Sequence, residues 1–135
     1  MRRDLLHKDL AKVIINCFYT VYNTLGYGFL EKVYENALAI ELRERGLKAQ
    51  QQYPIKVFYK RAVVGNYYAD IVVEDKVLLE LKAEESIAPK HKVQIQNYLK
   101  ASQLELGLIF NFGPQPSFKR RVFQNIPPQK LDKPR

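Results

Sequence analysis

The fold is decided by the stretch Ala69-Asp-Ile-Val-Val-Glu-Asp-Lys-Val-Leu-Leu-Glu-Leu-Lys82. Successive side chains of a β-strand point to opposite faces, so residues of one parity share a face. One parity of this stretch is entirely apolar: Ile71, Val73, Val77, Leu79 and Leu81. The other parity mixes apolar and charged residues: Asp70, Val72, Leu78, Glu80 and Lys82. The pattern predicts a β-hairpin with one buried face and one face that carries ionisable groups.

A three-residue turn over residues 74–76 keeps both apolar sets on one face of this hairpin. That register places Asp70 directly opposite Glu80, with Cβ atoms roughly 4.5–5.5 Å apart. Two facing carboxylates repel each other, and oxygen ligands of this kind suit Mg²⁺ or Mn²⁺. Lys82 follows on the same face, where it can orient or deprotonate a water, or offset charge at a phosphate. The stretch therefore indicates a metal-dependent hydrolytic site.

The same three residue types also occur on solvated sheet surfaces, which is the structural alternative. Val72 and Leu78 lie on the same face as the charged residues. Their presence favours a face that is partly covered, where unpaired carboxylates are costly. The alternative stays open from this pattern alone.

The rest of the chain supplies helices and further strands around this hairpin. Apolar residues at helical spacing predict helices over residues 4–25, 30–45 and 89–102. Segments rich in Val, Ile, Tyr and Phe predict strands over residues 53–59, 62–73, 77–82, 106–112 and 118–123. Gly65-Asn66 marks a bend or bulge within the second strand. Helices and strands in this order indicate a layered α/β domain.

Composition limits the possible functions. A chain of 135 residues with 47% apolar residues suits one domain, expected over residues 1–126. A Pro- and Lys-containing tail follows over residues 127–135, a composition that permits flexibility. The net charge of +8 suits a nucleic-acid partner but also serves solubility. The chain has one cysteine and no apolar run long enough to span a bilayer, so we expect a cytoplasmic protein that does not bind membranes.

Four other residues are ambiguous by spacing alone. Glu31 begins the second predicted helix, and an acid there complements the helix dipole, which favours a capping role over a ligand role. Gln94 and Tyr98 share one face of the later helix, where they can point at a site or cover the sheet edge. His91 has no carboxylate or cysteine spaced with it as a helical metal pair, so we expect it at the surface.

Several motifs resemble one known family. Gly28-Phe-Leu-Glu31-Lys-Val-Tyr34 resembles the signature of the GxxExxY proteins, a branch of the PD-(D/E)XK nuclease superfamily. Tyr67-Tyr-Ala-Asp70 resembles the strand with the first acid, and Glu80-Leu-Lys82 resembles E-x-K. The segments 91–99 and 106–113 resemble the family's Q-x-x-N-Y-L helix and closing strand. The resemblance runs from about Leu6 to Phe123, with Ala69 in place of the proline of the superfamily's name.

This resemblance implies a restriction-endonuclease-like core, with helices packed on a mixed sheet in the order α-β-β-β-α-β. It implies that Glu31, Asp70 and Glu80 bind Mg²⁺ or Mn²⁺, that Lys82 is the catalytic lysine, and that Gln94 and Tyr98 are accessory. The implied reaction is the hydrolysis of a nucleic-acid phosphodiester, with DNA favoured as substrate. Basic residues are expected to hold the phosphate backbone: Lys90, Lys92, Lys119, Arg120 and Arg121.

Two alternatives of other classes remain at this stage. The chain can be a nucleic-acid-binding module with a nuclease fold and no turnover, or an interaction protein with a solvated charged strand. The retained acids and lysine favour the enzyme. Small nucleases often address two strands as a pair, so a homodimer is a further expectation.

Overall fold

The computed structural model describes residues 6–124. The helices are α1 (Lys8–Leu25), α2 (Glu31–Glu44) and α3 (Pro89–Ser102), and the strands are β1 (Ala49–Tyr59), β2 (Ala62–Val73), β3 (Val77–Lys82), β4 (Leu106–Phe112) and β5 (Pro116–Val122). The expected tail over residues 127–135 lies outside the described residues. None of the helices within residues 6–124 has the length and apolar character to cross a membrane.

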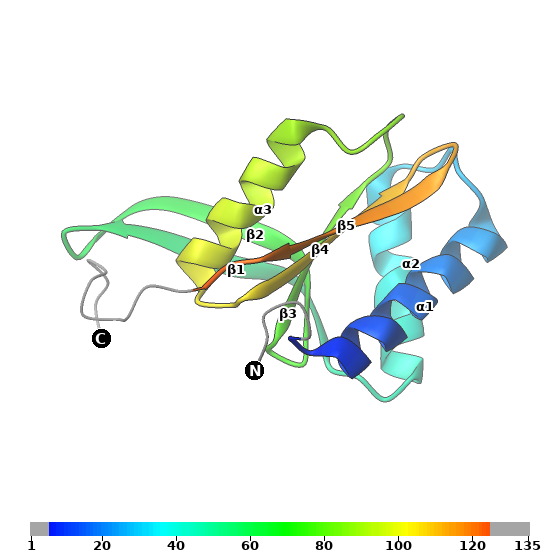
Figure 1. Ribbon diagram of the computed structural model, residues 1–135, viewed down its shortest axis with the longest axis horizontal. Helices are drawn as coiled ribbons and strands as arrows, with labels where there is room; N and C mark the ends of the chain where they lie inside the picture. The colour runs from blue at the N-terminus through cyan, green and yellow to red at the C-terminus, as the bar shows by residue number, and fades with distance from the viewer. Residues whose placement is uncertain (1–5, 125–135) are drawn as a thin grey trace.

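The five strands form one sheet in the order β1-β2-β3-β4-β5. β3 and β4 run parallel and the other neighbours are antiparallel, so the sheet is mixed, as predicted. The parallel pair requires a crossover, and α3 supplies it. Helices α1 and α2 lie on one face of the sheet and α3 lies on the other (Figure 1). The predicted α/β architecture is therefore confirmed.

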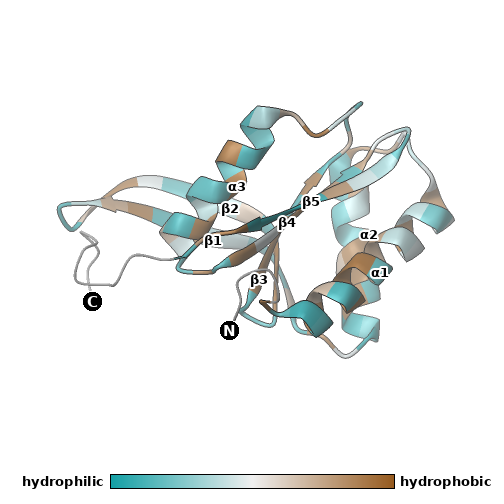
Figure 2. Cartoon of the chain, in the orientation of Figure 1, coloured by the Kyte–Doolittle hydropathy of each residue, from teal (hydrophilic) through white to brown (hydrophobic). Residues whose placement is uncertain are grey.

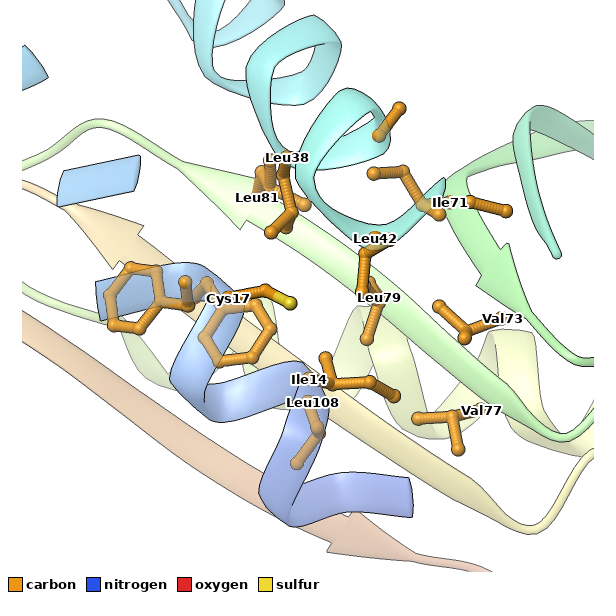
Figure 3. Packing of buried hydrophobic residues seen from close by; sticks show 14 of the residues in the cluster. Ile14, Cys17, Leu38, Leu42, Ile71, Val73, Val77, Leu79, Leu81 and Leu108 are labelled. Atoms are coloured by element: carbon orange, nitrogen blue, oxygen red, sulfur yellow. The ribbon is translucent and has the colours of Figure 1, made fainter. Parts of the chain in front are cut away.

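The larger part of the core lies between the sheet and the α1–α2 pair. Ile71, Val73, Val77, Leu79 and Leu81, the apolar parity of the central hairpin, all contribute to this layer (Figure 3). Cys17 is fully buried in it. A smaller cluster lies beneath α3 and includes Val72 and Leu78. Both faces of β3 are thus covered, as the apolar neighbours of Glu80 indicated.

Element bounds follow the predictions closely in the second half of the chain. β3, α3 and β4 have the predicted limits. β1 begins earlier, at Ala49, because a polar glutamine run also pairs with β2. The register between β1 and β2 shifts between Val57 and Phe58, opposite Gly65, and confirms a bulge there. β5 begins at Pro116.

The β1–β2 hairpin extends well beyond the sheet. β3 pairs with β2 only from Ile71 to Val73, whereas β1 pairs with β2 as far as its tip at Tyr59 and Ala62. We call residues 53–68 the hairpin arm. It projects away from α1 and α2 and passes beside α3 (Figure 1). It carries both apolar and polar stretches (Figure 2), and several of its tyrosines and valines are exposed.

Candidate active site

Asp70 and Glu80 meet where the β2–β3 ladder ends. The last regular pair is Ile71 with Leu79. One step further, the Asp70 N–H donates to Glu80 Oε1 at 3.1 Å, and the Leu81 N–H donates to Asp70 Oδ2 at 2.7 Å. The two side chains thus take up main-chain donors of the opposing strands. The hairpin register predicted from parity is confirmed.

The environment of this pair disfavours two negative charges. Burial raises the pKa of the Asp70 carboxyl, against the hydrogen bond from Leu81, which lowers it. Burial and then the neighbouring Asp70 charge raise the pKa of Glu80 to about 8. The Lys82 ammonium acts in the opposite direction on both carboxyls. A buried and a half-buried acid, both with raised pKa values and beside a lysine, are typical of functional sites.

Glu31 lies beside the pair. It occupies the first turn of α2, as the helix dipole favours, but its Oε2 accepts the Ala83 N–H at 3.3 Å, just beyond the end of β3. Its charge contributes to the raised pKa values of Asp70 and Glu80. Within residues 6–124, no three side chains among Asp, Glu, His and Cys lie close enough to form a metal-binding group. Glu31 is therefore adjacent to the pair without joining it.

Glu35, one turn after Glu31, is a site neighbour that the sequence reasoning missed. Its side chain is buried and pairs with Lys32 at 3.1 Å. It also accepts hydrogen bonds from the side-chain amides of Gln51 and Gln52, at 2.7 and 2.8 Å. Gln52 has a left-handed backbone, with φ of 53°. These bonds tie α2 to β1, and the i, i+4 spacing of Glu31 and Glu35 was the available signal.

The loop after β3 is fixed by Asn111, a second residue that the sequence reasoning missed. The Asn111 side chain is buried and makes two 2.9 Å bonds with the Glu84 main chain, one as acceptor and one as donor. Gly113 allows this approach, since a Cβ there would overlap the Glu84 carbonyl oxygen. The sequence signal for this role was the single polar residue within the apolar strand β4. The clamp holds the loop that presents Ala83 to Glu31.

The expectation that His91 lies at the surface is wrong. His91 is only 5% exposed, and its Nδ1 accepts the Ala88 N–H at 3.0 Å at the start of α3. Its Nε2 lies 3.3 Å from Glu84 Oε2. The burial comes from contact with the clamped loop, which helical spacing does not reveal. His91 thus fastens α3 to the loop after β3.

Gln94 and Tyr98 are brought to the site from α3. The Gln94 amide donates to the Tyr98 hydroxyl at 3.2 Å. Burial raises the pKa of Tyr98, and the Glu80 charge is the next largest cause. Tyr98 therefore stands near Glu80. Asn97, the residue before Tyr98, is exposed and takes no part in this hydrogen bond.

The expected backbone-binding residues separate into two groups. Lys90 and Lys92 are on α3, and Arg121 faces α3 across a shallow cavity that Lys92 also lines. Lys119 is exposed on β5, two residues before Arg121 and on the same face. Arg120 points to the opposite face, where it donates to the Leu6 carbonyl at 2.8 Å. Successive residues of a strand alternate between faces, so Arg120 lies on the other side of the sheet from Lys119 and Arg121.

Comparisons with known proteins agree with this geometry. The family model described as the PD-(D/E)XK nuclease superfamily matches residues 8–122. The search of curated proteins found no match. Among solved structures, that titled "Crystal structure of SSO0001" is 16% identical with a TM-score of 0.55, over 75% of this chain and 53% of that chain. An alkaline exonuclease from Laribacter hongkongensis is 15% identical with a TM-score of 0.51, over 69% of this chain and 56% of that chain. This chain thus matches little more than half the length of either, and the likeness shows the fold.

Proposed function

The chain belongs to the PD-(D/E)XK nuclease superfamily, and we propose that it is a divalent-metal-dependent endonuclease of the GxxExxY branch, with DNA as its favoured substrate. The observation that carries this proposal is the meeting of Asp70 and Glu80 at the end of the β2–β3 ladder. Purely structural carboxylates gain nothing from burial side by side, whereas a cation-binding pair requires it.

The donor set fits a hard divalent cation. Asp70 and Glu80 offer carboxylate oxygens in a buried setting where a cation offsets their repulsion. Glu31, adjacent to the pair in this structure, is proposed to turn toward it as a third ligand when a cation binds. Oxygen-only ligands favour Mg²⁺ or Mn²⁺ over zinc, which takes His and Cys in most protein sites. When bound, such an ion activates a water and offsets negative charge at the scissile phosphate.

The side chains around the pair have distinct proposed tasks. The Lys82 ammonium, whose charge acts on both carboxyls, donates a hydrogen bond that orients the attacking water or a phosphate oxygen. The Gln94 amide donates a 3.2 Å hydrogen bond to the Tyr98 hydroxyl and so fixes the position of that hydroxyl near Glu80. The clamp from Asn111 and the Glu31–Ala83 bond keep the end of β3 in place. Lys90, Lys92, Lys119 and Arg121 are proposed to hold the phosphate backbone.

The remaining expectations are part of the same proposal. The chain forms one folded domain over residues 1–126, acts in the cytoplasm, and pairs as a homodimer when two strands must be cut. Size-exclusion chromatography with light scattering, with and without duplex DNA, tests the dimer. A monomeric mass in both conditions contradicts it.

Cleavage assays test the proposed activity. Labelled single- and double-stranded DNA and RNA are incubated with Mg²⁺, Mn²⁺ or EDTA, and Glu80→Ala serves as the inactive control. We expect metal-dependent cleavage by the native chain and a loss of roughly a hundredfold or more in Asp70→Ala and Lys82→Ala. The matched control is Lys76→Ala, an exposed lysine in the turn of the same hairpin, which should keep full activity.

Two outcomes contradict the proposal. If Asp70→Ala and Lys82→Ala both cleave like the native chain, the assigned site is wrong. If the native chain binds nucleic acid but cleaves none of the substrates with either ion, the protein is the non-catalytic binding module.

A further inference from the structure

A cavity of about 660 Å³ lies between the hairpin arm and α3, next to the acidic pair. The arm contributes Lys56, Phe58 and Tyr67 to its lining, and α3 contributes Lys90, Tyr98 and Lys100. Pockets of this size hold small organic ligands in other proteins. Tyr98 belongs both to this cavity and to the surroundings of Glu80, so the cavity opens beside the proposed catalytic centre.

The charge of both walls favours a polyanion. The segment 49–69, which includes the arm, contains no Asp or Glu, and neither does the segment 86–104, which includes α3. Lys56, Lys90 and Lys100 therefore face the cavity without a carboxylate on either segment to neutralise them. Where β2 leaves the arm, the first acid is Asp70. Glu80 lies opposite it on β3. An anionic chain would be held along the cavity and kept from the acids unless a cation is bound there.

The aromatic residues favour a flat ligand. The rings of Tyr67, from the arm, and Tyr98, from α3, lie 5.7 Å apart at 41°, and both line the cavity. Tyr67 remains 48% exposed, so its ring offers surface to a ligand. Gly65 leaves room for that ring, since a Cβ at Gly65 would come 3.0 Å from Tyr67 Cε2. Lysines interleaved with accessible aromatic rings are the elements that bind unpaired nucleotides.

We propose that this cavity receives an unpaired base of a single-stranded polynucleotide, which stacks on Tyr67 while Lys56, Lys90 and Lys100 hold its phosphates. The inference rests on the proposed function in taking nucleic acid as the substrate, and it narrows that substrate to single-stranded or locally unpaired regions. Bases in a duplex are stacked on each other and cannot enter a side cavity. A duplex would contact the lysines without stacking a base on Tyr67.

Binding is measured by fluorescence anisotropy in EDTA, so that cleavage does not intervene. The probes are a labelled single-stranded DNA oligonucleotide, an RNA oligonucleotide of matching sequence, and the DNA duplex. Tyr67→Ala should weaken single-strand binding roughly fivefold or more, because stacking on one aromatic ring is lost. Tyr67→Phe should bind like the native chain, because the ring is kept. The duplex should bind more weakly than the single strands and change less than about twofold in Tyr67→Ala.

The matched control is Tyr68→Ala. Tyr68 is the next residue, is 56% exposed, and does not line the cavity. Its removal should leave single-strand affinity within about twofold of the native value. Thermal unfolding by circular dichroism checks that each variant is folded. If Tyr67→Ala is not, Tyr67→Leu takes its place, because it keeps an apolar side chain and removes the ring. The relative affinities for the DNA and RNA strands identify which polynucleotide the cavity prefers.

The inference is overturned if Tyr67→Ala and Tyr68→Ala affect single-strand binding equally, or if the duplex binds as tightly as the single strands. Because the assay contains no divalent ion, its result is independent of cleavage. A chain that stacks single strands on Tyr67 but never cleaves them refutes the proposed activity and leaves this inference standing.

Discussion

The two faces of the sheet differ in what they contribute, although they share the same strands. On β3, Leu79 and Leu81 point toward the α1–α2 layer. Glu80, between them, points to the opposite face, where it meets Asp70. The α1–α2 layer is dense and aromatic, with Phe18 stacked on Phe110 at 4.4 Å and Tyr34 on Phe112 at 4.3 Å. The α3 face has a smaller apolar cluster, the buried Glu80 beside the half-buried Asp70, and the cavity. Stability is concentrated on one face, and the other face can therefore hold groups that oppose folding.

Leu79→Ala should cause the largest loss of stability in this comparison. Leu79 is fully buried beneath α1 and α2, so its removal leaves a cavity in the main core. We expect a decrease of about 3 kcal/mol in the free energy of unfolding. Urea denaturation followed by circular dichroism measures it. A decrease below about 1 kcal/mol would mean that the α1–α2 layer is not the main source of stability.

Asn111→Ala should reduce stability less than Leu79→Ala, because it removes hydrogen bonds rather than buried apolar contacts. The substitution removes both hydrogen bonds to the Glu84 main chain. We expect a loss of about 1–2 kcal/mol in unfolding free energy. Hydrogen exchange of the Glu84 amide should accelerate as the clamp is lost. Unchanged exchange at Glu84 would contradict the assignment of Asn111 as the clamp.

Glu80→Gln should stabilise the metal-free protein in alkaline solution, the opposite sign to Leu79→Ala one residue away. The folded protein holds the Glu80 proton up to a pKa of about 8, whereas the unfolded chain releases it near the ordinary value of 4.5. The stability that this protonated carboxyl contributes is complete below pH 4.5 and is lost as the pH rises through 8. Glutamine mimics the protonated form at every pH.

Thermal unfolding in EDTA at pH 5 and pH 8.5 measures this effect. We expect the free energy of unfolding of Glu80→Gln to exceed that of the native chain by roughly 1–3 kcal/mol at pH 8.5 and by much less at pH 5. Asp75→Asn, in the exposed turn of the same hairpin, is the matched control and should show no such pH dependence. A variant that is less stable than the native chain at pH 8.5 would contradict the picture of two opposed faces.

Much of this arrangement could be predicted because the relevant signals are local. Parity along residues 69–82 was sufficient to place Asp70 beside Glu80 and to assign Leu79 to the buried face. The bounds of α3 followed from Pro89 and apolar spacing, and β4 from an uninterrupted apolar run. These features depend on strand alternation and helical periodicity, which any sequence displays directly.

The errors and omissions arise from contacts between distant segments. The burial of His91 depends on Glu84 and on the loop clamped by Asn111. The hydrogen bond from Arg120 to the Leu6 carbonyl likewise joins residues far apart in the sequence. In the sequence, Glu35 resembles an exposed helix residue. Its role depends on hydrogen bonds from Gln51 and Gln52 of β1, which the sequence does not reveal. The cavity beneath the hairpin arm is likewise invisible in the sequence, because it requires the arm to extend past the sheet beside α3.

The central claim is that Asp70 and Glu80 form a divalent-cation site, and Mn²⁺-induced broadening of backbone amide signals in NMR spectra tests it most directly. Broadening by the paramagnetic ion locates even weak binding. In the native chain we expect the amides of Asp70, Leu81 and Ala83 to broaden first, and in Glu80→Gln we expect this broadening to be lost, while Asp75→Asn retains it. Broadening that centres on other residues, or that persists unchanged in Glu80→Gln, would contradict the account.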